Sequence, residues 1–104
     1  MSQYNYIVKP RAQQKVYSFY HNVARKYKHT YDFDDFMRNV RSAIDSMYQI
    51  ERTLLRREPI IPRWIGYYMA NTDKWYFAYI MSGNTIIIVD ACHAQNMKTW
   101  HIVK

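Results

Sequence analysis

Apolar side chains recur every three or four positions in two stretches of the chain, and this spacing predicts two amphipathic helices. The first stretch follows Pro10, which suits the first turn of a helix, and it runs from Ala12 to Tyr27. The second begins at Asp32, a residue suited to cap a helix, and it continues through Leu55 to end before Pro59. Because the connection between them is short, we expect an antiparallel helical hairpin.

Shorter runs rich in β-branched and aromatic residues predict strands on both sides of this hairpin. One run, at residues 4–8, precedes the helices, and three runs at 64–69, 75–81 and 85–89 follow them as a meander with turn residues in between. Both faces of 75–81 are bulky, which indicates either a central strand or a strand whose second face holds a functional aromatic surface. The order β-α-α-β-β-β predicts an α+β fold in which the helical hairpin packs on a mostly antiparallel four-stranded sheet.

The length and composition predict one domain spanning residues 1–104. Cys92 is the only cysteine, so the chain cannot form an internal disulfide or a cysteine-built zinc site. We expect no metal and no cofactor, since no spacing links the histidines as a ligand pair. The first residues do not resemble a signal peptide, and no apolar run approaches the ~20 residues that span a bilayer. These features predict a soluble, cytoplasmic protein without membrane contact.

The charge of the chain favours a polyanionic partner. Its 15 Lys and Arg residues outnumber its 8 Asp and Glu residues, and residues 1–31 contain six cations and no acid. A second basic group comprises Arg38, Arg41, Arg52, Arg56, Arg57 and Arg63. Three of them, Arg52, Arg56 and Arg57, lie near the predicted end of the second helix, where cations also favour the helix dipole. Charge alone does not separate RNA from DNA, or either from an acidic protein.

The last predicted strand runs into Asp90-Ala91-Cys92-His93, and its end displays the residue that we weigh first as functional. An imidazole at a strand end is suited to acid–base chemistry, although a cap or surface histidine explains it equally simply. Cys92 alternates with His93, so we expect it on the opposite face as a small buried side chain rather than as a nucleophile. Asp90 either caps the strand end or pairs with a nearby arginine.

Several segments, taken with this element order, resemble the RelE/ParE superfamily of bacterial toxins. They are Pro10-Arg11-Ala12 after the first strand, Pro62-Arg63-Trp64-Ile65 entering the sheet, Lys74-Trp75-Tyr76-Phe77-Ala78-Tyr79 as the central strand, and Ile86-Ile87-Ile88-Val89 leading to His93. The resemblance covers most of the chain, but it lies in pattern and length, and no single motif is diagnostic.

The resemblance implies the toxin component of a toxin–antitoxin system: a ribosome-dependent, metal-independent mRNA endonuclease, or an inhibitor of DNA gyrase. It implies an antitoxin protein as partner in a hetero-oligomer, with the ribosome and mRNA as targets of the nuclease branch. It also implies catalytic roles for His93, Arg63 and Tyr79. We add a nucleic-acid-binding set that comprises Arg52, Arg56, Arg57, Lys74, Lys98 and Tyr76.

Two departures from the family pattern keep other functions open. Nuclease members commonly carry an arginine inside the central strand, whereas residues 75–79 here contain no cation. The segment after the last strand offers Gln95 and Asn96 where an arginine is expected. The alternative is therefore a non-catalytic member of the fold that binds a protein or nucleic acid. A third hypothesis is a small RNA-binding domain unrelated to toxins.

Overall fold

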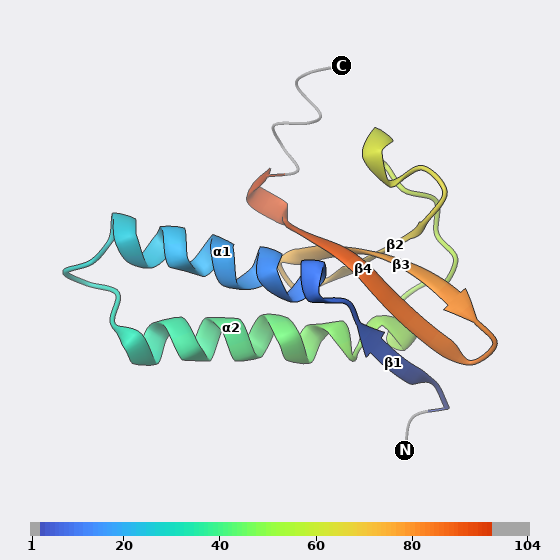
Figure 1. Cartoon of the computed structure of the whole chain (residues 1–104), viewed down its shortest axis with the longest axis horizontal. Helices are drawn as coiled ribbons and strands as arrows, with labels where there is room; N and C mark the ends of the chain where they lie inside the picture. The colour runs from blue at the N-terminus through green and yellow to red at the C-terminus, as the bar shows by residue number, and fades with distance from the viewer. Residues whose placement is uncertain (1–2, 97–104) are drawn as a thin grey trace.

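The structure is a computed structural model, and it describes residues 3–96 of the chain. The chain forms β1 (Asn5–Val8), α1 (Pro10–Lys26), α2 (Phe33–Met47), β2 (Tyr68–Thr72), β3 (Trp75–Ser82) and β4 (Thr85–His93), as Figure 1 shows. Two short 3₁₀ turns, η1 (Ile50–Arg52) and η2 (Pro62–Trp64), lie between α2 and β2. This order confirms the α+β class. Within residues 3–96, no helix combines the length and the apolar character that crossing a membrane requires.

The four strands form one mixed sheet in the order β1-β4-β3-β2. β3 pairs antiparallel with both β2 and β4, which makes it a central strand as its two bulky faces predict. β1 pairs parallel with β4, from Asn5 opposite Thr85 to Val8 opposite Ile88. This parallel pairing brings the start of α1 beside the second half of β4, although the two segments are about seventy to eighty positions apart in the sequence.

The two helices begin where local signals predict. Pro10 occupies the first position of α1. At the start of α2, Asp32 and Asp35 form a capping box: the Asp35 N–H donates to Asp32 Oδ1 (2.9 Å), and the Asp32 N–H donates to Asp35 Oδ2 (3.2 Å). The helices lie side by side as a hairpin whose tip extends beyond the sheet (Figure 1).

The predicted length of the second helix is wrong, because α2 ends at Met47 and not near Leu55. The tertiary structure supplies a partner for the backbone beyond this point. The Tyr6 hydroxyl from β1 accepts a hydrogen bond from the Glu51 N–H (3.0 Å) and donates one to Glu51 Oε1 (3.0 Å). This N–H would otherwise bond the helix carbonyl four residues earlier. Ile50 still turns into the core, whereas Leu54, placed on the apolar stripe by the sequence pattern, is 76% exposed.

Two of the predicted strands also have different bounds. The strand expected at 64–69 begins at Tyr68, because Pro62 starts the η2 turn and Gly66 has a φ of 98° that interrupts extended structure. β2 runs to Thr72, so the turn between β2 and β3 falls at Asp73 and Lys74 and not at the predicted Asn71–Asp73. The last strand, expected to end at Val89, continues to His93.

The sheet is covered unevenly on its two faces. The larger apolar cluster lies between the sheet and the two helices, and its largest fully buried side chains from the sheet are Trp75, Phe77, Tyr79, Ile86 and Ile88. A smaller cluster covers part of the opposite face, where Ile61 and Trp64 pack on Met69, Ala78 and Cys92. The segment between α2 and β2 therefore acts as a partial cover for the face that the helices leave open.

Candidate functional site

A β-bulge in β4 decides which way the end of this strand faces. Ala78 pairs with Asp90 and Tyr79 pairs with Ile88, so Val89 is left without an opposite residue. Before the bulge the even-numbered residues Ile86 and Ile88 face the helices, and after it the odd-numbered Ala91 does so. The bulge thus turns His93 toward α1, while Cys92 joins the cluster on the other face. The expected separation of Cys92 from His93 is confirmed.

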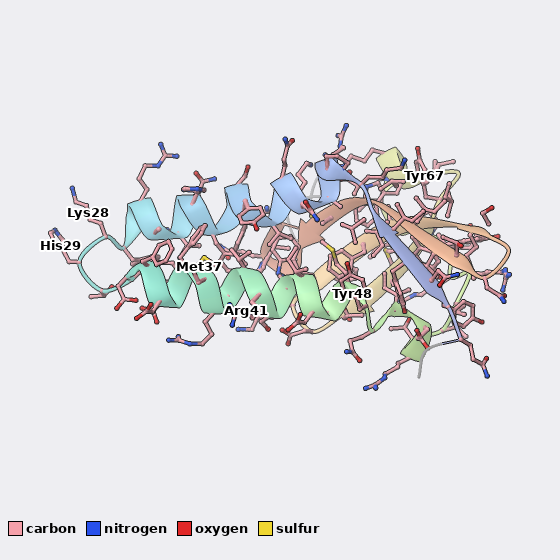
Figure 2. The ribbon with its side chains drawn as sticks, turned by 60° about the horizontal axis from the view of Figure 1, so that its bottom comes forward. Lys28, His29, Met37, Arg41, Tyr48 and Tyr67 are labelled. Atoms are coloured by element: carbon pink, nitrogen blue, oxygen red, sulfur yellow. The ribbon has the colours of Figure 1, made fainter. Side chains whose placement is uncertain are left out.

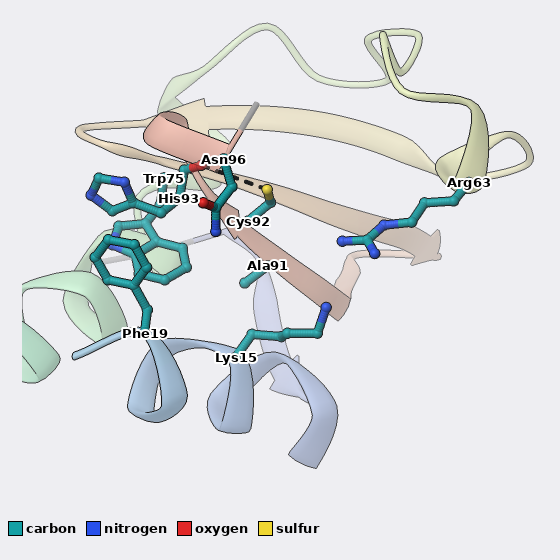
Figure 3. A pocket seen from close by; sticks show the side chains of 8 residues that line it. All are labelled: Lys15, Phe19, Arg63, Trp75, Ala91, Cys92, His93 and Asn96. Carbon is teal, nitrogen blue, oxygen red and sulfur yellow. Dashed lines mark hydrogen bonds between the residues drawn. The ribbon is translucent and has the colours of Figure 1, made fainter. Parts of the chain in front are cut away.

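A cavity of about 330 Å³ opens where β4 extends past the end of β1. Its walls come from α1, the η2 turn, the start of β3 and the end of β4. Figure 3 shows the eight residues that line it: Lys15, Phe19, Arg63, Trp75, Ala91, Cys92, His93 and Asn96. Lys15 and Arg63 point toward one another from opposite walls, whereas the His93 ring lies at the far end beside Phe19. The cavity therefore has a cationic end and an aromatic end.

Asp90 holds the cationic end together. It is 6% exposed, and its Oδ2 accepts a hydrogen bond from Trp64 Nε1–H (3.0 Å) while its Oδ1 accepts one from the Ala91 N–H (2.8 Å). Two cations of α1 approach the same carboxylate: Arg11 Nε lies 3.7 Å and Lys15 Nζ 3.6 Å from Oδ1. The predicted pairing of Asp90 with an arginine is confirmed. Because Trp64 is adjacent to Arg63, the Asp90 carboxylate positions both cations of this end, Lys15 on α1 and Arg63 on η2.

Substitution of Asp90 by asparagine is expected to lower the free energy of unfolding by about 1–3 kcal/mol. An amide has one acceptor oxygen, so it can satisfy Trp64 Nε1–H or the Ala91 N–H but leaves the other donor facing an NH₂ group. Urea denaturation measures the loss. Asp45→Asn is the matched control, because Asp45 is exposed on α2. Equal stability of Asp90→Asn and the wild type would show that the carboxylate does not tie η2 to β4.

His93 is packed into the aromatic end of the cavity. Its ring stacks on Phe19 with centroids 4.1 Å apart and meets Trp75 edge-on at 5.2 Å. Its Nδ1 accepts a hydrogen bond from the Gln95 N–H (3.1 Å), which favours the neutral tautomer with the proton on Nε2. Burial lowers the pKa of this imidazole, and the charge of Lys74 lowers it further. His93 is therefore biased toward the neutral form.

The lowered pKa of His93 makes the stability of the fold depend on pH. The folded chain takes up this proton less readily than the unfolded chain, whose imidazole titrates near 6.5. The stabilisation is therefore complete above pH 6.5 and is lost as the pH falls through the lower folded pKa. We expect the free energy of unfolding of the wild type to decline more steeply between pH 7.5 and 5 than that of His93→Gln. Parallel pH profiles of the two proteins in urea titrations would contradict this assignment.

The structure brings together only part of the predicted site. Arg63 and His93 line the same cavity, and Lys74 is near enough for its charge to act on His93. Tyr79, predicted as catalytic, is instead buried beneath the helices, where its hydroxyl accepts the Arg56 N–H (2.9 Å) and burial raises its pKa. Tyr76 is half-buried on the other face of the sheet, against the smaller cluster.

The remaining predicted contacts are not among the residues that line this cavity. Arg52, Arg56 and Arg57 are exposed in the segment after α2, and the Arg57 carbonyl accepts the Met69 N–H (2.9 Å) at the edge of β2. Lys98 lies outside the described residues. Lys15, Phe19 and Asn96 line the cavity but were not predicted as site residues. Lys15 and Phe19 fall on a helix whose pattern signals only amphipathicity, so nothing local in the sequence marks them.

Within residues 3–96, no three His, Cys, Asp or Glu side chains are grouped closely enough to hold a metal ion. The cavity itself presents two cations, an amide and an imidazole. Two cations suit a phosphate, an amide can donate or accept, and a largely neutral imidazole lies at the other end.

No protein-family model matches this chain, and no curated protein matches it either.

Proposed function

We propose that this protein is a RelE/ParE-like toxin that binds RNA in the cavity beside β4 and cleaves it. The single observation that carries the proposal is the pair of facing cations, Lys15 and Arg63, at one end of a cavity that also contains His93 (Figure 3). The element order supports it as well, since a helical hairpin packs on a four-stranded sheet of the kind that the resemblance implies.

The cationic end suits the scissile phosphate. A phosphate between Lys15 and Arg63 receives charge-assisted hydrogen bonds from two walls, and both cations stabilise the additional negative charge of a phosphorane. Attack of the ribose 2′-oxygen on phosphorus forms the new P–O bond, and the bond to the 5′-oxygen breaks. The products are a 2′,3′-cyclic phosphate and a free 5′-hydroxyl, and no metal ion is required for this transfer.

We assign the proton transfers to His93, whose ring lies at the other end of the same cavity, so the bound ribose must extend from the cationic end toward it. A neutral imidazole can accept the proton of the 2′-hydroxyl, and the imidazolium can return it to the departing 5′-oxygen. The lowered pKa of His93 favours the accepting form at neutral pH. The remaining parts of the proposal are an mRNA substrate presented by the ribosome, a cytoplasmic location, and an antitoxin that neutralises the toxin in a hetero-oligomer.

Induced expression in a bacterial host tests this function. RNA ends that carry a 5′-hydroxyl are captured by ligation with and without prior phosphorylation and then sequenced. We expect RNA ends that are captured only after phosphorylation, and we expect them at a constant position within the codon, in transcripts that are being translated. Growth arrest with intact mRNA contradicts cleavage. Arg63→Gln is expected to reduce cleavage. Arg41→Gln is its matched control, because Arg41 is exposed on α2 (Figure 2) and is not among the residues that line the cavity.

Replacement of Lys15 by glutamine is expected to reduce the salt dependence of RNA binding. Each phosphate contact with single-stranded RNA contributes about 0.7 to the slope of log K against log salt concentration, because one condensed counterion is released. Fluorescence anisotropy with a labelled oligoribonucleotide between 50 and 300 mM salt, roughly the range in which the slope is linear, measures it. Arg41→Gln should leave the slope unchanged. A Lys15→Gln slope equal to that of the wild type would remove Lys15 from the phosphate site.

The second candidate function is binding without cleavage, and the environment of His93 favours it. Nδ1 already accepts the Gln95 N–H, so Nε2 carries the proton and is a donor, not an acceptor. Acceptance of a 2′-hydroxyl proton requires a switch of tautomer and the loss of this hydrogen bond. A non-catalytic protein that binds nucleic acid or a protein such as gyrase through its basic face needs no such step. Growth arrest that persists in His93→Gln would favour this second function.

A further inference from the structure

Three isoleucines form a row across the sheet on the face opposite the helices. Ile7 of β1 is paired with Ile87 of β4, which is paired in turn with Ile80 of β3. Directly opposite residues project from the same face, and the neighbours of all three along their strands pack against the helices. Ile7 is 47% and Ile80 37% exposed, and Ile87 is half-buried. The isoleucine row is therefore a contiguous aliphatic surface beyond the smaller cluster.

The row continues toward a cationic hollow. Val89 follows Ile87 on β4 and lines a second cavity of about 200 Å³ together with Arg11, Arg63, Trp64, Tyr67 and Asp90. Lys9 follows Ile7 by two positions, so it lies beside the start of the row and is exposed. Asp90, the acid of this cavity, is buried and already contacts Arg11. The outward charge next to the aliphatic surface is thus positive.

We propose that this surface, the isoleucine row with Lys9 and Arg11, is the docking site of an acidic peptide segment that carries aliphatic side chains. Its aliphatic side chains would cover the three isoleucines, and its carboxylates would meet the two cations. RNA fits the row poorly, since isoleucine offers neither a ring on which a base stacks nor a hydrogen-bond donor. A second copy of this chain fits poorly too, because each copy carries a net charge of +7.

This docking site does not depend on RNA cleavage. None of the three isoleucines lines the cavity that contains His93, so a protein without nuclease activity would still bind the peptide. His93→Gln should therefore retain peptide binding in full. If the wild-type protein does not cleave RNA, the proposed function is wrong but the docking site still stands. If the wild-type protein binds no acidic peptide, the docking site is wrong but the proposed function still stands.

Selection from a displayed library of 12-residue peptides tests the proposal. Each position draws equally on Leu, Ile, Asp, Glu, Lys, Arg and Ser, and the target is the full chain. We expect the enriched peptides to combine aliphatic residues with a net negative charge. Selected peptides, made synthetically, are then measured by fluorescence anisotropy. Combined Ile7→Ser and Ile80→Ser should raise Kd at least tenfold, and combined Lys9→Gln and Arg11→Gln should raise it several-fold and flatten its salt dependence.

Phe33→Ser is the matched control, because Phe33 is 72% exposed but begins α2 at the tip of the hairpin, far from the sheet (Figure 1). Its Kd should equal that of the wild type, and thermal melts show that every variant is folded. Failure to enrich acidic peptides, or peptides that bind the isoleucine variant as tightly as the wild type, overturns the proposal. Loss of binding to phosphatidylserine vesicles in the isoleucine variant, without any acidic peptide enriched, would instead assign the surface to membranes.

Discussion

Substitution of Trp75 by alanine is expected to lower the free energy of unfolding by about 3–5 kcal/mol, which approaches the whole stability of a domain of this size. Trp75 is 2% exposed at the start of β3, where its ring stacks with Phe77 at 6.3 Å and meets Phe19 of α1 at 5.6 Å. Its Nε1–H donates to the Tyr20 hydroxyl (3.3 Å). Truncation therefore removes a large apolar contact between helix and sheet and leaves a cavity.

Urea denaturation monitored by circular dichroism measures the effect, since the other two tryptophans complicate a fluorescence signal. Trp75→Phe is the informative control. It keeps an aromatic ring at the position but loses the hydrogen bond to Tyr20. We expect this loss to lower the free energy of unfolding by about 1 kcal/mol. A Trp75→Ala protein that unfolds at the same urea concentration as the wild type would show that α1 is not held on the sheet through this residue.

Replacement of His93 by alanine is expected to reduce RNA cleavage by about 10²–10⁴-fold, the range that a general acid–base group contributes. The imidazole is the group in the cavity that can both accept and return a proton near neutral pH. The reduction should appear in single-turnover cleavage on programmed ribosomes, with RNA binding little changed, because the variant keeps Lys15 and Arg63, the proposed phosphate contacts. A protein that cleaves as fast without the imidazole as with it would exclude His93 from the chemistry.

Two controls separate a chemical role of His93 from its packing role. His21→Ala removes an exposed imidazole of α1 and should leave cleavage unchanged. The pH dependence gives the second control: a base must be unprotonated, so the cleavage rate should rise as the pH increases through the pKa of His93 and level off above it. Since burial and Lys74 place that pKa below its ordinary value, the plateau should be reached already at neutral pH.

Local residues were sufficient to predict where several elements begin. Pro10 starts α1 because its ring restricts φ and it lacks the N–H that the first helical turn leaves unbonded. Asp32 and Asp35 start α2 because their side chains bond the first N–H groups of the same helix. The alternation of large side chains in β3 likewise predicted a strand with two covered faces. For the two helix starts, the groups that decide the position lie within a few residues of one another.

The ends of the elements depended on partners that are distant in the sequence. α2 stops at Met47 where the Tyr6 hydroxyl of β1 takes up the Glu51 N–H, forty-five positions away. β2 begins late because the segment around η2 crosses the sheet to bury Trp64 against Cys92 and Ala78. No local pattern encodes these contacts. The apolar pattern continues to Leu55, and it therefore does not indicate that the helix ends at Met47.

The sequence by itself determined the α+β class, the starts of the helices, the separation of Cys92 from His93 along a strand, and the presence of Arg63 and His93 as candidates. The tertiary structure alone decided that they share a cavity, and that Lys15 completes it. The parallel pairing of β1 with β4 carries the first turns of α1 to the end of the last strand, and the bulge at Val89 turns His93 toward them. Both are long-range backbone pairings, whose register depends on the whole sheet and not on any segment of it.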